Sequence, residues 1–181
     1  MDDNLLIQLN GLPDGSKRYH WDLGKEFFAS FGNSEILEAA VSVGVKLEKS
    51  GDYIGLDIDL DGKVTVPCDR CLAPLELEVR DTFYLSVKFG SGDFIKDEEA
   101  QPAGDGGDFR EIVWLPEDAE GIDIRQDVYD YTYLNLPSRK VHDEGYCDPD
   151  VVRYLGRDKA TVSGNNPFES LKDVLLKDLG L

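Results

Sequence analysis

Residues 37–48 read LEAAVSVGVKLE, and this stretch decides the class of the fold. Apolar side chains recur at every second position, and polar or small residues stand between them. The repeating positions are Leu37, Ala39, Val41, Val43, Val45 and Leu47. A period of two residues places successive side chains on opposite faces of an extended chain, so one face can be buried. We therefore predict a long, half-buried β-strand here.

The same alternation continues along the chain to residue 89. A turn at 49–52 leads to a second strand over 54–60, and Asp61-Gly62 predicts a tight hairpin. Further strands are expected over 64–68 and 75–89. The predicted class is α+β: a mostly antiparallel β-sheet meander, partly barrel-like, with a few short helices.

The flanking segments complete this picture. We predict a short helix over 21–32 and a strand over 110–116. Residues 122–137 favour a helix, although the alternating tyrosines also suit a strand. A stretch rich in glycine and acid at about 90–108 predicts a mobile acidic loop. A capped, amphipathic pattern at about 166–180 predicts a C-terminal helix.

The length of the chain and its first residues indicate a single cytoplasmic domain. The 181 residues suit one domain spanning 1–181, and 41% of them are hydrophobic, which allows a sizeable core. The first residues carry acid where a secretory signal needs a basic leader, and no segment has the roughly 18 apolar residues of a membrane span. We therefore expect a cytoplasmic protein without a membrane anchor.

The formal charge of −18 restricts the class of partner. Nucleic acids and anionic lipids attract basic surfaces, so we expect no high-affinity binding to bare nucleic acid and no membrane docking. Residues 90–130 hold 13 acidic and three basic residues, a local net charge of −10. Beside a strand that carries Trp114, this field predicts capture of a basic partner. The alternative is that the acidity serves solubility alone.

The motif Cys68-Asp69-Arg70-Cys71 is the most informative local feature. Two sulfurs at this spacing can bind one zinc ion, and a structural zinc site needs about four ligands. His142 and Cys147 supply the remaining two, so the predicted metal set is Cys68, Cys71, His142 and Cys147. This set uses every cysteine of the chain and one of its two histidines. It predicts one structural zinc ion and no other cofactor.

Two other interpretations of the cysteines remain open. The pair is a redox dithiol if a nearby positive charge lowers a thiol pKa, but no helix follows the motif to supply its dipole. Alternatively, the cysteines only shape a turn. The sequence contains neither a phosphate-binding loop nor a catalytic triad pattern, so we predict no enzymatic activity.

The order of these motifs resembles the YceD-like large ribosomal RNA subunit accumulation family. The resemblance rests on Cys68, Arg70, Cys71 and Leu72, on LNLPSRKVHDEGYC at 134–147, and on NPFESLKDVL at 166–175. It runs from about residue 35 to the end of the chain, which carries one C-terminal cysteine where some members have a further CxxC.

The resemblance implies a non-enzymatic ribosome-biogenesis factor that supports accumulation or maturation of the large-subunit (23S) ribosomal RNA. With the acidic charge, it predicts an adaptor for a basic large-subunit ribosomal protein or a pre-ribosomal particle. The expected partner contacts are Arg70, Leu72 and Trp114. Two rival functions are a small zinc-binding thiol protein, acting as redox sensor or thiol enzyme through the CxxC, and a nucleic-acid mimic that binds a basic protein.

Overall fold

A computed structural model of the chain describes residues 5–90, 102–103 and 108–157. These residues belong to two compact units. The first, called the sheet unit, is drawn from residues 1–67 and 74–140. The second, called the cysteine unit, is drawn from residues 68–73 and from residue 141 onward. Each unit is considered by itself.

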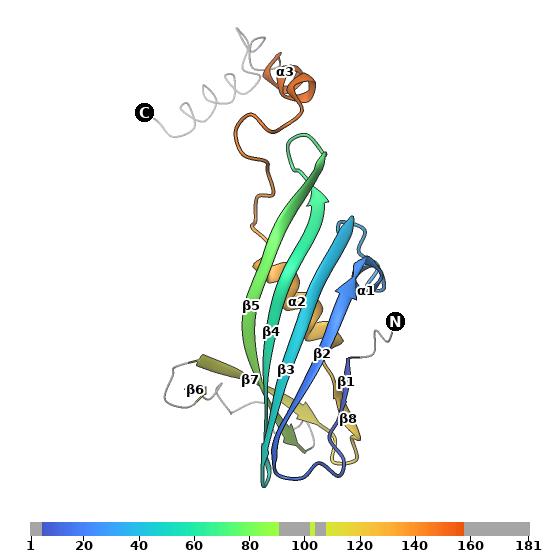
Figure 1. Ribbon diagram of the computed structural model, residues 1–181, viewed down its shortest axis with the longest axis vertical. Helices are drawn as coiled ribbons and strands as arrows, with labels where there is room; N and C mark the ends of the chain where they lie inside the picture. The colour runs from blue at the N-terminus through green and yellow to red at the C-terminus, as the bar shows by residue number, and fades with distance from the viewer. Residues whose placement is uncertain (1–4, 91–101, 104–107, 158–181) are drawn as a thin grey trace, which may run out of the picture. The chain divides into compact units, whose positions relative to one another are not determined.

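The sheet unit is built on a six-stranded sheet (Figure 1). Its strand order is β2 (Gly15–Gly24), β3 (Glu38–Ser50), β4 (Tyr53–Pro67), β5 (Pro74–Phe89), β7 (Asp108–Leu115) and β6 (Pro102–Ala103). Strands β2 to β5 form the predicted antiparallel meander, and β7 joins β5 in parallel. Within the described residues the sheet is open, so no barrel closes.

Short elements accompany this sheet. Strand β1 (Leu6–Gln8) pairs with β8 (Gly121–Asp123), and two helices, α1 (Lys25–Ala29) and α2 (Arg125–Asn135), complete the sheet unit. Helix α3 (Pro149–Arg157) belongs to the cysteine unit. No helix in the described part of the chain is long and apolar enough to cross a membrane.

One face of the sheet forms the core, as the alternation predicts. The register aligns Val45 of β3 with Ile58 of β4, and Ile58 with Phe83 of β5, and all three side chains are buried. Residues of the short elements, such as Phe28 and Ile124, are buried in the same cluster. Figure 1 shows α2 lying along the sheet. Each fully buried aliphatic side chain stabilises the fold by about 1.5–3 kcal/mol, so this face dominates the stability of the unit.

The outer face of the sheet carries acids with nearby partners. Asp57, Asp59 and Asp61 follow one another along β4. Arg110 forms an ion pair with Asp57 at 2.6 Å, and Arg80 pairs with Asp61 at 2.8 Å. The Thr82 hydroxyl donates to Asp59 at 2.8 Å. Much of the negative charge on this face is therefore satisfied within the sheet.

The predicted hairpin at Asp61-Gly62 is wrong. Strand β4 runs through both residues to Pro67, and the chain reverses only after it. The apolar parity continues unbroken through Leu60 and Val64, so a single long strand keeps every apolar side chain on the buried face. Gly62 serves a different purpose, because a Cβ there would lie 2.2 Å from the carbonyl oxygen of Ala40. It permits a close approach of two strands.

The flanking predictions have mixed outcomes. The strand over 110–116 corresponds to β7, and the helix over 122–137 corresponds to α2. The helix expected over 21–32 is confined to α1, because β2 continues to Gly24. Most of the predicted acidic loop lies outside the described residues. The predicted C-terminal helix at 166–180 also lies outside them, and α3 was not predicted.

Gly62→Ala tests the close approach between β3 and β4. The added methyl group meets backbone that cannot rotate away, and overpacking of this kind costs about 1–3 kcal/mol. We expect a matching fall in the free energy of unfolding, measured by urea denaturation. Gly44→Ala is the matched control, since its Cβ would lie 3.9 Å from the Asp59 side chain. Equal effects of the two substitutions would contradict this account.

Candidate functional site

The first half of the candidate site is the turn that connects β4 to β5. The Leu72 N–H donates to the Cys68 carbonyl at 2.8 Å, and the Cys68 N–H donates to the Ala73 carbonyl at 2.9 Å. Leu72 adopts φ 61°, in the left-handed region that side chains rarely occupy. This tight turn faces both cysteine sulfurs inward, because Cys68 is 0% and Cys71 8% exposed.

The second half follows the sheet unit in the chain. Residues 141–148 form a turn in which the Tyr146 N–H donates to the Asp143 carbonyl at 3.1 Å. Gly145 takes φ 89°, which suits glycine at this bend. The turn places Cys147 directly before α3, and the Cys147 side chain is buried.

The structure brings the four predicted ligands together within the cysteine unit. Their ligand atoms all lie within 4.8 Å of one another. The sulfurs of Cys68 and Cys147 are 3.9 Å apart, and Nδ1 of His142 lies 3.5 Å from the Cys71 sulfur and 3.9 Å from that of Cys147. The three cysteines are free thiols rather than a disulfide and a lone cysteine.

Backbone groups around the turn favour the charged form of two thiols. Burial opposes ionisation of Cys68, but hydrogen bonds from the backbone of Cys71, His142 and Arg70 outweigh it and lower its pKa to about 6. Backbone hydrogen bonds from Asp148 and Ala73 lower the pKa of Cys71. The third thiol differs.

The pKa of Cys147 is shifted in the opposite direction. Burial and the neighbouring sulfurs of Cys71 and Cys68 raise its pKa, because a third negative charge in the same small space is unfavourable. The Arg70 guanidinium offsets part of this repulsion, since its Nη1 lies 3.7 Å from the Cys147 sulfur. Ionisation of one of these thiols therefore makes ionisation of its neighbours less favourable.

The predicted partner contacts are divided between the units. Arg70 and Leu72 belong to the cysteine unit, where the Leu72 side chain is 76% exposed. Trp114 belongs to the sheet unit and is half-buried on β7, with the Lys88 ammonium 5.5 Å from its ring centre. It lines a hollow of about 620 Å³ with Lys88 and Phe89. Trp114 is therefore not part of the cysteine–histidine cluster.

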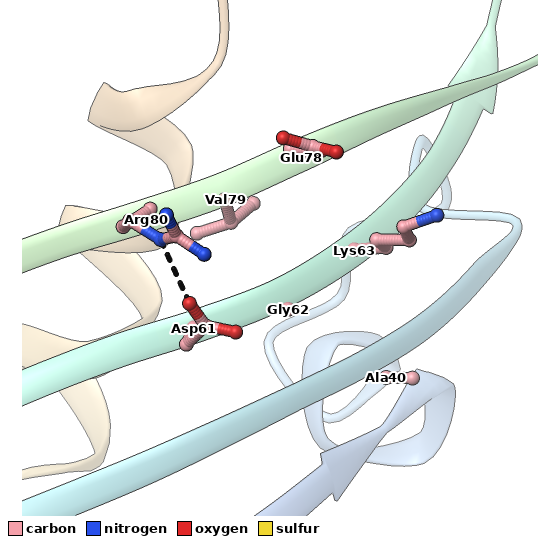
Figure 2. Close-up of a pocket in the computed structure, with 7 residues that line it drawn as sticks. All are labelled: Ala40, Asp61, Gly62, Lys63, Glu78, Val79 and Arg80. Carbon is pink, nitrogen blue, oxygen red and sulfur yellow. Dashed lines mark hydrogen bonds and ion pairs between the residues drawn. The ribbon is translucent and has the colours of Figure 1, made fainter.

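Figure 2 shows a second hollow, of about 290 Å³, over β3, β4 and β5. Asp61 and Arg80 point toward each other there. Lys63, which also lines the hollow, pairs at 2.7 Å with Glu76 outside it. These charged groups neutralise one another rather than converging on a common point. The hollow offers little to a charged ligand.

An acidic cluster around α2 was missed by sequence reasoning. Burial and the carboxylates of Glu111, Asp130 and Asp123 raise the pKa of Asp127. A carboxylate in the first turn of a helix ordinarily gains from the helix dipole, so burial and repulsion must dominate here. Asp127 and Asp130, three positions apart, share one face of α2, and this spacing was the available indication. Asp123 ends β8 just before the helix. Glu111 joins them from β7, which the sequence did not reveal.

Comparison with known proteins identifies a matching family. The family model described as large ribosomal RNA subunit accumulation protein YceD matches residues 56–175, or 120 of the 181 residues. The matched range includes the cysteine–histidine cluster and α2. It confirms the resemblance inferred from the cysteine motif and the segment at 134–147. No curated protein and no solved structure matches the chain.

Asp127→Asn tests the combined cost of burial and repulsion for the Asp127 carboxylate. A carboxyl with a raised folded-state pKa destabilises the fold when ionised; this penalty is absent below the unfolded pKa of about 3.9 and grows as the pH rises. We expect the variant to exceed wild type in free energy of unfolding at pH 7, with the difference vanishing near pH 3. Urea denaturation at both pH values measures it.

Asp118→Asn is the control for this experiment. Asp118 is exposed in the segment before β8, so its replacement removes the same formal charge outside the cluster. A gain at pH 7 as large as that of Asp127→Asn would show that overall charge, not the cluster, is responsible. A gain that persists at pH 3 would exclude ionisation as the cause.

Proposed function

Because the chain belongs to the YceD family of large ribosomal RNA subunit accumulation proteins, we propose that it acts as an acidic adaptor in large-subunit assembly. In this role it supports accumulation or maturation of the 23S ribosomal RNA by binding a basic ribosomal protein or a pre-ribosomal particle. It is cytoplasmic and performs no catalytic step. The acidic cluster around α2 is the observation that carries the partner assignment.

The α2 cluster favours a cationic partner on energetic grounds. Burial raises the pKa of the half-buried Asp127, and repulsion from Glu111, Asp130 and Asp123 raises it further. Within the cluster Asp123 pairs with Arg125, and Asp130 accepts a hydrogen bond from the Gln126 amide at 2.9 Å. On β4, by comparison, Asp57 and Asp61 both pair with arginines. A lysine- or arginine-rich surface placed against α2 would relieve the remaining repulsion. Such complementary potentials also increase association rates and disfavour acidic competitors such as RNA.

Leu72 supports a contact site in the cysteine unit. A left-handed conformation costs a residue with a side chain roughly 1–2 kcal/mol, and glycine would avoid most of this cost. The Leu72 side chain is 76% exposed, so it recovers little by burial in the free protein. Strained and exposed side chains of this kind occur at functional sites. We assign Leu72, with the neighbouring Arg70, to partner contact.

The geometry disfavours the thiol-enzyme alternative. A reactive cysteine needs an accessible thiolate, and such cysteines are partly exposed. The sulfur-bearing side chains of Cys68, Cys71 and Cys147 are only 0%, 8% and 6% exposed. The low pKa of Cys68 therefore occurs where a disulfide substrate has little access.

The adaptor role predicts salt-sensitive binding to basic large-subunit proteins. We expect purified large-subunit ribosomal proteins, tested singly, to include at least one that binds the full chain and loses about tenfold or more affinity between low and physiological salt. Isothermal calorimetry at several salt concentrations measures this. Large-subunit ribosomal RNA alone is the negative control. Absence of salt-sensitive binding across the set, or tighter binding to the bare RNA, would refute the proposal.

Leu72→Gly tests whether the Leu72 side chain serves partner binding or the stability of the fold. Removing the side chain relieves the left-handed strain, while the added freedom of the unfolded chain costs about 0.4–1 kcal/mol. We expect the free energy of unfolding to stay unchanged or rise by up to about 1.5 kcal/mol, and partner affinity to fall. Tyr53→Ala is the control, since Tyr53 is also a large exposed side chain and lies on β4, outside α2 and the cysteine unit. A clearly destabilised Leu72→Gly protein would assign the leucine to the fold instead.

A further inference from the structure

The cysteine unit lacks an apolar core among its described residues. The buried hydrophobic cluster of the protein draws only on the sheet unit. In the cysteine unit, the buried side chains within 68–73 and 141–155 are those of the three cysteines. Its larger apolar side chains face solvent: Leu72, Tyr146, Val152, Tyr154 and Leu155. Described segments of this size without a core ordinarily need a disulfide or a metal, and the three cysteines form no disulfide.

Three of the six distances between the ligand atoms fit a tetrahedral zinc site, and the other three are no longer than 4.8 Å. Zinc binds cysteine sulfur at about 2.3 Å and histidine nitrogen at about 2.0–2.1 Å. A regular tetrahedron with these bond lengths has sulfur–sulfur edges of about 3.8 Å and sulfur–nitrogen edges of about 3.6 Å. The corresponding distances are 3.9 Å between Cys68 and Cys147, and 3.5 and 3.9 Å from the His142 Nδ1 to the sulfurs of Cys71 and Cys147.

The surroundings of the four ligands suit the same ion. Three thiolates and one neutral imidazole select zinc over calcium or magnesium, which prefer oxygen. The backbone N–H of Arg70 donates to the Cys68 sulfur at 3.4 Å. A zinc ion with three thiolates carries a net charge of −1, and the Arg70 guanidinium beside Cys147 compensates it. The four protein ligands complete the coordination, which is the pattern of a structural site rather than a catalytic one.

We propose that Cys68, Cys71, His142 and Cys147 bind one structural Zn²⁺, which takes the place of an apolar core in the cysteine unit. The ion joins the turn between β4 and β5 to a segment about 70 residues later in the chain. This site goes beyond the adaptor role and does not depend on it. The sheet unit, with its own core, folds without the metal.

Metal analysis of the full chain, purified without chelator, is the first test. We expect one zinc per chain by atomic emission. Replacement by Co²⁺ should give the visible bands of a tetrahedral site and an intense sulfur-to-cobalt charge-transfer band. Protein without metal that takes up neither Zn²⁺ nor Co²⁺ at one equivalent, and whose three thiols react freely in the native state, would overturn the proposal. A metal that binds only with octahedral cobalt bands would overturn it as well.

Single substitutions identify the ligands. Cys147→Ser and His142→Ala should each weaken zinc affinity by more than the roughly 10- to 100-fold that changes to outer groups cause. His20→Ala is the matched control, because His20 is the other histidine of the chain and lies exposed on β2. Arg70→Ala should fall within the 10- to 100-fold range, whereas Arg70→Lys should retain part of the affinity. Equal affinity of His142→Ala and His20→Ala would exclude His142 from the site.

Hydrogen exchange tests the structural role and remains informative if a variant folds poorly. After chelation of the wild-type protein, amides in 141–157 should lose protection while those of β3 and β4 keep it. Restoring one equivalent of zinc should restore protection. If chelation leaves 141–157 protected, or removes protection from both units equally, the ion is not the core of the cysteine unit.

Discussion

The one-sided burial of β3, β4 and β5 is the constraint on which the sheet unit depends. Three long strands held in register place Val45, Ile58 and Phe83 in one row on one face. That face must be covered, and the short elements supply side chains such as Phe28 and Ile124 to its core. The opposite face takes the acids of β4 and several of their partners. Burial at about 25 cal/mol per Å² of apolar surface makes this arrangement far stronger than any single ion pair.

Much of this architecture could be predicted from the sequence, because a strand with one buried face has apolar residues at every second position. The parity of residues 37–47 predicted both the strand and its buried face. Positions 41, 43, 45 and 47 are buried, whereas Ala39 is half-buried and Leu37 precedes β3. The hairpin prediction at Asp61-Gly62 was wrong because this dipeptide suits either a tight turn or a close approach of two strands. Only the position of Ala40 in the folded protein distinguishes the two cases. The parallel pairing of β7 with β5 likewise depends on tertiary contacts.

The candidate site could be predicted only in part from the sequence. The composition offered only three cysteines and two histidines, so the ligand set Cys68, Cys71, His142 and Cys147 followed from scarcity, and the structure brings these four together. The strain at Leu72 was invisible, because φ is a property of the folded turn. The α2 cluster was half visible: its helical spacing lies in the sequence, whereas Glu111 reaches it only through the sheet.

With the proposed zinc site, the two units are stabilised by different means, and this difference has a functional consequence. Apolar burial in the sheet unit responds weakly to solution chemistry. A zinc site contributes roughly 10–16 kcal/mol in small zinc-binding peptides at neutral pH and is lost to chelation or acid. A contribution of this size is several times the roughly 1–2 kcal/mol of backbone strain at Leu72. With the proposed zinc bound, the exposed leucine and Arg70 are held in one conformation for a partner. Without it, the sheet unit would keep its acidic cluster while the second contact surface is lost.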